Sequence, residues 1–108
     1  MPEELILAID TGNTHTVLGC IRSNGKISPT LRMETNSSHT EYEYAADMSR
    51  ILELEGVDPK SFTGSIISSV VPSMNETLKR AVRLITGLDA IVVGAGVKTG
   101  LDIGLDDP

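Results

Sequence analysis

The sequence predicts an α/β fold, in which helices pack on a mixed sheet in the chain order β-β-β-α-β-α-β. Three observations support this fold class. Apolar runs joined by turn sequences occupy the first part of the chain, the apolar spacing then becomes helical, and each later apolar run follows a helix. Strands joined by tight turns pair antiparallel, whereas strands joined through a helix form parallel, right-handed crossovers. Both kinds of pairing are therefore expected in one sheet.

The first two strands are joined by a polar turn. Residues 5–9 form a continuous apolar run, typical of a strand buried on both faces, and this strand ends on Asp10. A second strand is expected at about 16–22. After it, the Asn24-Gly25 pair favours a type I′ hairpin, in which both central residues have positive φ.

The third strand, at about 27–35, is expected at an edge of the sheet. Its apolar residues Ile27, Leu31 and Met33 share one parity, and polar residues occupy the other. Pro29 has no N–H to donate to a neighbouring strand, which favours an edge position.

A helix and a strand follow. Thr40 and Glu43 form a capping box ahead of a helix near 41–55, and Gly56 ends that helix. Residues 65–71 are expected to form a strand that Pro72 ends.

The remaining elements complete the fold. Ser73 and Glu76 predict a second capping box, which opens a helix that Gly87 ends. Residues 90–93 are expected to form a short buried strand, and the Gly- and Asp-rich residues 94–108 have no clear period. This order matches the ribonuclease-H-like core, or actin-like ATPase fold, of the acetate kinase, sugar kinase, Hsp70 and actin superfamily.

Composition excludes several classes of function. The chain has 108 residues, and its 9 Lys and Arg against 15 Asp and Glu leave a net charge of −6. Such a balance argues against partners that are nucleic acids or anionic membranes. The single Cys20 excludes a disulfide framework and is interpreted as a core residue, and His15 and His39 lack partners at metal-ligand spacing. No segment has the length of a signal peptide core or a membrane span, so a cytoplasmic location is expected.

The strongest chemical signal is Asp10-Thr11-Gly12-Asn13-Thr14. A carboxylate that ends a buried strand needs a partner, and a hydrated Mg²⁺ bound to phosphate is one such partner. A polar hairpin turn, in which Asp10 accepts hydrogen bonds from the turn, is the alternative that composition alone favours. The position directly after an apolar strand favours the phosphate site.

A second signal is the glycine-rich segment from Val93 to Gly100. It has neither the order of a P-loop nor that of a dinucleotide fingerprint, so a flexible exit loop and a substrate loop with Thr99 as a donor both remain open. The segment from Ser68 to Pro72 borders a cleft or leads into a helix cap, with about equal support.

Taken together, these segments resemble type III pantothenate kinases. Asp10-Thr11-Gly12-Asn13-Thr14, then Ile67-Ser68-Ser69-Val70-Val71-Pro72, then Val93-Gly94-Ala95-Gly96-Val97-Lys98-Thr99-Gly100-Leu101 occur in the order and rough spacing of that family. The resemblance covers the whole chain, and the Thr40–Tyr44 segment resembles the family's entry to its first helix.

The resemblance implies ATP-dependent phosphorylation of pantothenate to 4′-phosphopantothenate, the first step of coenzyme A biosynthesis. It implies two related domains, of which residues 1–108 are the N-terminal one, and a homodimer that needs Mg²⁺ and a monovalent cation, K⁺ or NH₄⁺. By residue matching, the phosphate-binding set is Asp10, Thr11, Gly12, Asn13, Thr14, His15, Thr16 and Val17, with Asp10 also the Mg²⁺ residue through water. The matching substrate-binding set is Gly94, Gly96, Thr99, Gly100 and Leu105.

Two departures from the family bear on the function, whereas a third, Ala95 where proline is usual, is expected to be tolerated. The aspartate that serves as the family's general base lies in a Gly-Ala-Asp-Arg segment beyond the position of Pro108, so no catalytic residue and no turnover are expected in this chain alone. Leu105 stands where the family often has a tyrosine that contacts pantothenate. A non-catalytic regulatory or accessory protein on the same scaffold is therefore one alternative function, and an ordinary mixed α/β binding domain, complete at 108 residues, is a second.

Overall fold

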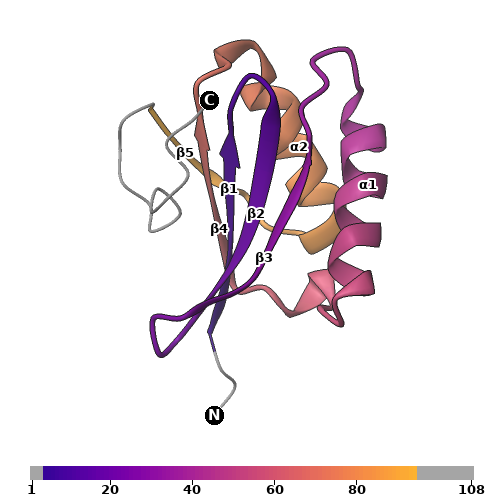
Figure 1. The fold of residues 1–108 in the computed structure, drawn as a ribbon. Coiled ribbons are helices and arrows are strands. Elements are labelled where there is room, and N and C mark those ends of the chain that lie inside the picture. Colours follow the sequence, from indigo (N-terminus) through magenta and orange to yellow (C-terminus); the bar gives the residue numbers. More distant parts are fainter. Residues whose placement is uncertain (1–3, 95–108) are drawn as a thin grey trace.

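The computed structural model describes residues 4–94. Its five strands form one sheet in the order β3-β2-β1-β4-β5 (Figure 1). The strands are β1 Leu5–Thr11, β2 His15–Arg22, β3 Ile27–Glu34, β4 Gly64–Ser69 and β5 Ile91–Val93. β1 pairs antiparallel with β2, as does β2 with β3, whereas β4 pairs parallel with both β1 and β5. The predicted mixed sheet and the predicted edge position of the third strand are confirmed.

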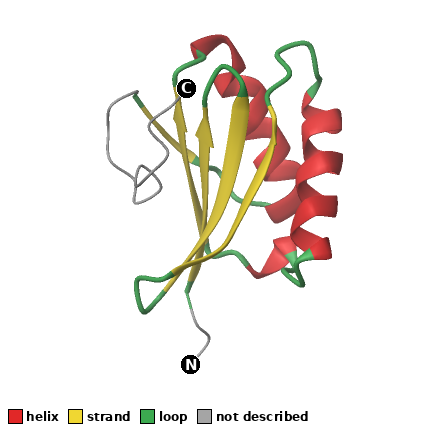
Figure 2. Ribbon diagram, in the orientation of Figure 1, coloured by secondary structure: helices red, strands yellow, loops and turns green. Residues whose placement is uncertain are grey.

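Two helices, α1 Glu41–Leu54 and α2 Asn75–Thr86, cover one face of this sheet (Figure 2). Alternate residues of β1 face these helices, since successive side chains of a strand point to opposite faces. The resulting core is formed by Leu7 and Ile9 of β1, Leu18 and Cys20 of β2, Ile67 of β4, Tyr44, Met48 and Leu52 of α1, and Leu78, Val82 and Ile85 of α2. The residues between them on β1, which include Asp10, point to the opposite face.

The capping box at the start of α1 is confirmed. The Glu43 N–H donates to Thr40 Oγ1 at 3.2 Å, and the Thr40 N–H donates to Glu43 Oε1 at 2.7 Å. Gly56 has a φ of 78° just after the helix, which is the left-handed conformation that glycine adopts at little cost.

The predicted second capping box is wrong. Residues Pro72–Met74 form a short 3₁₀ helix, and Met74 precedes α2 without a side-chain cap. An N-cap residue needs an extended backbone. Ser73 lies inside the 3₁₀ turn instead, because Pro72 is well suited to begin a helical turn and begins it one residue too early.

The hairpin between β2 and β3 also differs from expectation. The Arg22 N–H donates to Lys26 O at 2.8 Å and the Gly25 N–H donates to Arg22 O at 2.9 Å, so the loop has three residues. Among residues 4–94 only glycines have positive φ, and Asn24 does not. A three-residue loop requires the left-handed conformation only at its last residue, here Gly25 with a φ of 87°, so a type I′ turn is not formed.

β3 contains a bulge that changes which face its side chains occupy. Ile21 pairs with Ile27, but Gly19 pairs with Thr30, so Ser28 and Pro29 together oppose a single residue of β2. Opposite residues of an antiparallel pair share a face. Leu31 and Met33 therefore pack against the core while Ile27, despite its equal parity, lies with Ile21 on the other face.

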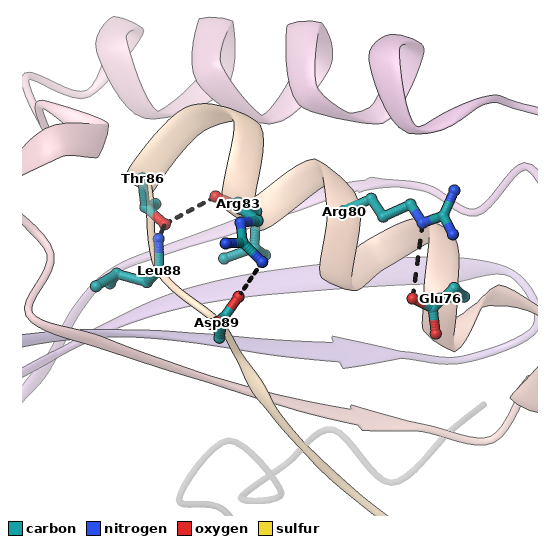
Figure 3. Close-up of polar contacts among 7 residues, drawn as sticks. Glu76, Arg80, Arg83, Thr86, Leu88 and Asp89 are labelled. Atoms are coloured by element: carbon teal, nitrogen blue, oxygen red, sulfur yellow. Dashed lines mark hydrogen bonds and ion pairs between the residues drawn. The ribbon is translucent and has the colours of Figure 1, made fainter.

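The end of α2 leads directly into β5 (Figure 3). Thr86 Oγ1 donates to Val82 O at 2.7 Å and accepts from the Leu88 N–H at 3.0 Å, and Gly87 has a φ of 80°. An exposed ion pair of 2.8 Å joins Arg83 to Asp89. The expectation of a buried final strand is wrong, because β5 is an edge strand of the sheet that residues 4–94 form, and Ile91, which faces away from the helices, is 65% exposed.

Candidate functional site

A tight loop joins β1 to β2 at the edge of the sheet where β1, β4 and β5 have their carboxyl ends. The strand pairing ends with Thr11 opposite Thr16, and the Gly12 N–H then donates to His15 O at 2.9 Å. We call residues 12–14 the β1–β2 loop. Gly12 is buried, whereas Asn13 and Thr14 are exposed at the tip. Ligands of α/β sheets with parallel strands bind outside the carboxyl ends of those strands, so the loop lies where a ligand is expected.

Asp10 lies beneath this loop on the face of the sheet that the helices do not cover. It is half-buried and in register with Val17 of β2 and Ser68 of β4, of which Ser68 is only 6% exposed. Thr11 and Thr16 point the other way and are fully buried on the helix side. The segment 10–17 thus divides into a carboxylate on one face, two hydroxyls on the other and a polar tip between them.

Thr35, which immediately follows β3, holds the loop from the helix side. Its Oγ1 donates to Gly12 O at 2.9 Å and lies 2.9 Å from Thr16 Oγ1, while its N–H donates to Thr14 O at 2.9 Å. Sequence reasoning missed Thr35, since no local motif marks it. The pairing of β3 with β2 could have indicated it, but only with the bulge taken into account.

Tyr44 of α1 anchors the backbone next to Thr35. Its hydroxyl accepts a hydrogen bond from the Asn36 N–H at 2.7 Å and donates to Asn36 O at 2.9 Å. The side chain is fully buried, and this burial raises the pKa of the Tyr44 phenol, so the hydroxyl stays neutral and able to donate. The helix layer is thereby connected to the β1–β2 loop through two successive residues.

The exit from β4 is ordered by local hydrogen bonds. The Val70 N–H donates to Thr11 O at 3.0 Å, which joins the ends of β4 and β1. Ser69 Oγ accepts from the Val71 N–H at 2.9 Å and donates to Val71 O at 3.0 Å. The Ser69 hydroxyl therefore serves to end the strand, and Ser68 is the serine of this segment that lies beside Asp10.

The tip of the β1–β2 loop offers backbone donors to an anion. Neither the Asn13 N–H nor the Thr14 N–H has an acceptor among residues 4–94. Exposed successive N–H groups of a turn form a concave site that binds phosphate oxygens.

Beside the β1–β2 loop, the described residues offer a metal ion few protein ligands. Within residues 4–94 no three His, Cys, Asp or Glu side chains gather as a metal site. Mg²⁺ commonly keeps several waters and is held by one or two carboxylates together with substrate phosphates. The single carboxylate of Asp10, next to a loop with exposed amide donors, fits that mode of binding.

Of the expected substrate residues, the structure describes Gly94. It is exposed directly after β5, and a Cβ added to it would meet no atom within 4 Å. Because Val93 pairs with Ser68, which pairs with Asp10, Gly94 lies at the same edge of the sheet as the β1–β2 loop. Gly96, Thr99, Gly100 and Leu105 lie outside the described residues.

Other features of residues 4–94 are not part of the β1–β2 loop. A hollow of about 360 Å³ between the start of α1 and α2 is lined by Tyr42, Arg80 and Leu84. Cys20 is fully buried in the core, as expected, and burial raises the pKa of its thiol. None of the described helices is long and apolar enough to cross a membrane.

A family model and curated relatives both match this chain. The model of the family "Type III pantothenate kinase" matches residues 6–108. The type III pantothenate kinases of Bifidobacterium adolescentis and Bacillus cytotoxicus are 38% and 39% identical to this chain over 104 residues, which is 96% of the chain. The chain spans about 40% of the length of these relatives.

Solved structures share the fold at low sequence identity. A ROK family glucokinase from Streptomyces griseus, solved with glucose and AMPPNP, superposes with a TM-score of 0.57 at 20% identity, over 83% of this chain and 33% of that protein. RuvC from T. thermophilus superposes with a TM-score of 0.52 at 13% identity, over 84% of this chain and 64% of that protein. The predicted ribonuclease-H-like fold is thereby confirmed.

Proposed function

Because the chain belongs to the type III pantothenate kinase family, we propose that it forms the first phosphate-binding part of an enzyme that phosphorylates pantothenate with ATP. The product is 4′-phosphopantothenate, and the reaction is the first step of coenzyme A biosynthesis. In this proposal residues 1–108 are the N-terminal ribonuclease-H-like domain of a two-domain, homodimeric kinase. The match over residues 6–108 and the coverage of about 40% of the relatives' length support this assignment.

The observation that carries the proposal is the geometry of the β1–β2 loop. Two backbone N–H groups without acceptors among the described residues lie at the tip, and the Asp10 carboxylate lies on the adjoining strand. Phosphoryl transfer is catalysed mainly by positioning and electrostatic stabilisation of phosphate oxygens. An ordered set of amide donors next to one carboxylate is suited to that task.

The residues of the site take distinct roles in this mechanism. The Asn13 and Thr14 N–H groups donate to phosphate oxygens of ATP, and Asp10 accepts hydrogen bonds from the water shell of Mg²⁺. The buried hydroxyls of Thr11 and Thr16 support the loop from below, and His15 and Val17 begin the strand that follows it. The chemistry that Mg²⁺ supplies when bound is the neutralisation of charge on the β- and γ-phosphates.

The acceptor side of the reaction is assigned by family resemblance. Gly94, Gly96, Thr99, Gly100 and Leu105 are the proposed pantothenate contacts. The general base that deprotonates the pantothenate hydroxyl belongs to a segment beyond Pro108, as does the site for K⁺ or NH₄⁺. The 108 residues by themselves are therefore expected to bind phosphate without turning over pantothenate.

A hybrid enzyme tests the proposal. Residues 1–108 replace the matching part of the Bacillus cytotoxicus relative, and phosphopantothenate formation is measured with ATP and pantothenate. We expect an active hybrid, a loss of at least about 100-fold in kcat/KM on Asp10→Ala, and no activity in the 108-residue chain alone. Asp89→Ala is the matched control, since Asp89 is exposed and pairs only with Arg83 among the described residues.

Three results would count against the proposal. They are a folded but inactive hybrid, unchanged kinetics in Asp10→Ala, and turnover by the 108-residue chain alone. A folded hybrid that binds Mg·ATP but does not phosphorylate pantothenate would favour the regulatory or accessory alternative, to which the departure at Leu105 points.

A further inference from the structure

The β1–β2 loop is held by a residue that lies outside it and outside every motif of the family resemblance. Thr35 reaches both ends of the loop, with its hydroxyl at Gly12 O and its N–H at Thr14 O, both at 2.9 Å. We propose that Thr35 is a positioning residue that directs the Asn13 N–H toward the phosphate of the nucleotide. This inference rests on the proposed function.

The direction of each hydrogen bond follows from counting protons. A threonine hydroxyl has one proton to donate and two lone pairs to accept. The Thr35 proton is used toward Gly12 O, a carbonyl that can only accept. The single proton of the Thr16 hydroxyl must therefore be donated in the 2.9 Å contact with Thr35 rather than in the longer contact of 3.5 Å with Thr11 Oγ1. Thr16 is fully buried, so its hydroxyl is an internal support and is turned away from solvent.

The hydrogen bond to Gly12 O also fixes the direction of the Asn13 N–H, because both groups belong to the same peptide. In a planar trans peptide the C=O of one residue and the N–H of the next point in opposite directions. Only the bond between Ser28 and Pro29 is cis among the described residues. Since Gly12 C=O points toward Thr35, the Asn13 N–H points away from it, out of the helix layer and toward the exposed tip.

The two groups of Thr35 act on different peptides of the loop. The hydroxyl holds the peptide between Gly12 and Asn13, whereas the backbone N–H holds the peptide between Thr14 and His15. A substitution that removes only the hydroxyl should release the Asn13 N–H and leave the His15 N–H in place. General destabilisation of the chain would loosen both amides, so a loss of order at the Asn13 amide alone would point to the Thr35 hydroxyl.

The test compares Thr35→Val, which removes the hydroxyl at nearly constant volume, with Thr35→Ser, which keeps it. Thr30→Val is the matched control, because Thr30 is exposed on β3, the strand that leads to Thr35. Amide order parameters are measured by ¹⁵N NMR relaxation in the 108-residue chain, and Mg·ATP is titrated against the same signals. If Thr35→Val does not fold, Thr35→Ala takes its place, since it removes the hydroxyl without placing a methyl group against Gly12 O.

We expect the Asn13 order parameter to fall from about 0.85 to below about 0.6 in Thr35→Val, while His15 keeps its wild-type value. The apparent Kd for Mg·ATP should rise about tenfold, the effect of losing one hydrogen bond, and Thr35→Ser should restore both values to within about twofold. Thr30→Val should match the wild type.

Other outcomes would overturn the inference. It fails if Asn13 stays as ordered in Thr35→Val as in the wild type, if Asn13 and His15 loosen equally, or if Thr35→Ser does not restore the loop. Failure of the proposed function gives a different result, since Mg·ATP would then shift no loop amide in the wild-type chain. In that case the order parameters still decide whether Thr35 directs the Asn13 N–H.

Discussion

The contact between Tyr44 and Asn36 gives a sharp test of how the loop is supported. Tyr44→Phe removes one hydroxyl from a fully buried side chain and leaves the ring in place. The Asn36 N–H then loses an acceptor at 2.7 Å, and Asn36 O loses a donor at 2.9 Å. Because Asn36 directly follows Thr35, the change also loosens the segment that holds the β1–β2 loop.

The expected cost follows from these two bonds. Each intramolecular hydrogen bond contributes about 0.5–1.5 kcal/mol net, so the loss of both lowers the free energy of unfolding by about 1–3 kcal/mol. The contact is only partly buried, and water can satisfy part of the lost bonding, which favours a value of about 2 kcal/mol. This is a large share of the ~5–15 kcal/mol that stabilises a typical domain.

Urea unfolding measures the effect, with Tyr42→Phe as the matched control. Tyr42 lies two residues away on the same helix and is 67% exposed, so the control should change stability by less than about 0.5 kcal/mol. Equal m-values would show that the comparison concerns stability alone. The reasoning is refuted if the two phenylalanine variants unfold at the same urea concentration.

Three further predictions concern the helix caps and the core. Thr40→Ala should lower the free energy of unfolding by about 1 kcal/mol, whereas Ser73→Ala should change it by less than about 0.5 kcal/mol, because only Thr40 accepts a capping bond; equal losses in thermal unfolding would contradict this. The hydrogen bond from the Thr40 N–H lowers the pKa of Glu43, so the carboxylate stabilises the fold above its unfolded-state pKa and loses this effect as the pH falls through the folded-state value. The stability difference between the wild type and Glu43→Gln should thus shrink from about pH 7 to about pH 3, and a difference that does not depend on pH would count against the assignment. Burial raises the pKa of the Cys20 thiol, so a thiol reagent should react with it at least about tenfold more slowly in the native chain than in denaturant, with equal rates as the contrary result.

Elements with local signals were predictable from the sequence. The capping box of α1 needs only Thr40 and Glu43, three residues apart, and both of its bonds are present. The apolar run of β1 likewise predicts a central strand, and the residue pattern around Asp10 indicates the loop that follows. Such signals survive folding because the residues that make them are neighbours in the chain and remain so in the structure.

The sequence motifs gave wrong predictions at two places where a motif allowed more than one local conformation. Ser73 and Glu76 have the spacing of a capping box, but Pro72 begins a 3₁₀ turn before Ser73 can act as a cap. Asn24-Gly25 is compatible with loops of two or three residues, and the strand pairing selects three. In both cases the choice depended on a neighbouring element rather than on the motif itself.

The sequence by itself determined the order of strands and helices, the Asp10 carboxylate near the end of β1 and the polar loop that follows the strand. Only the tertiary structure decided which residue supports that loop. Side chains alternate between the faces of a strand, so the one-residue bulge at Ser28 and Pro29 reverses the face of every residue after it. That reversal brings Thr35 to the helix side, against Thr16 and Gly12 O, and it depends on strand pairing that no single segment encodes.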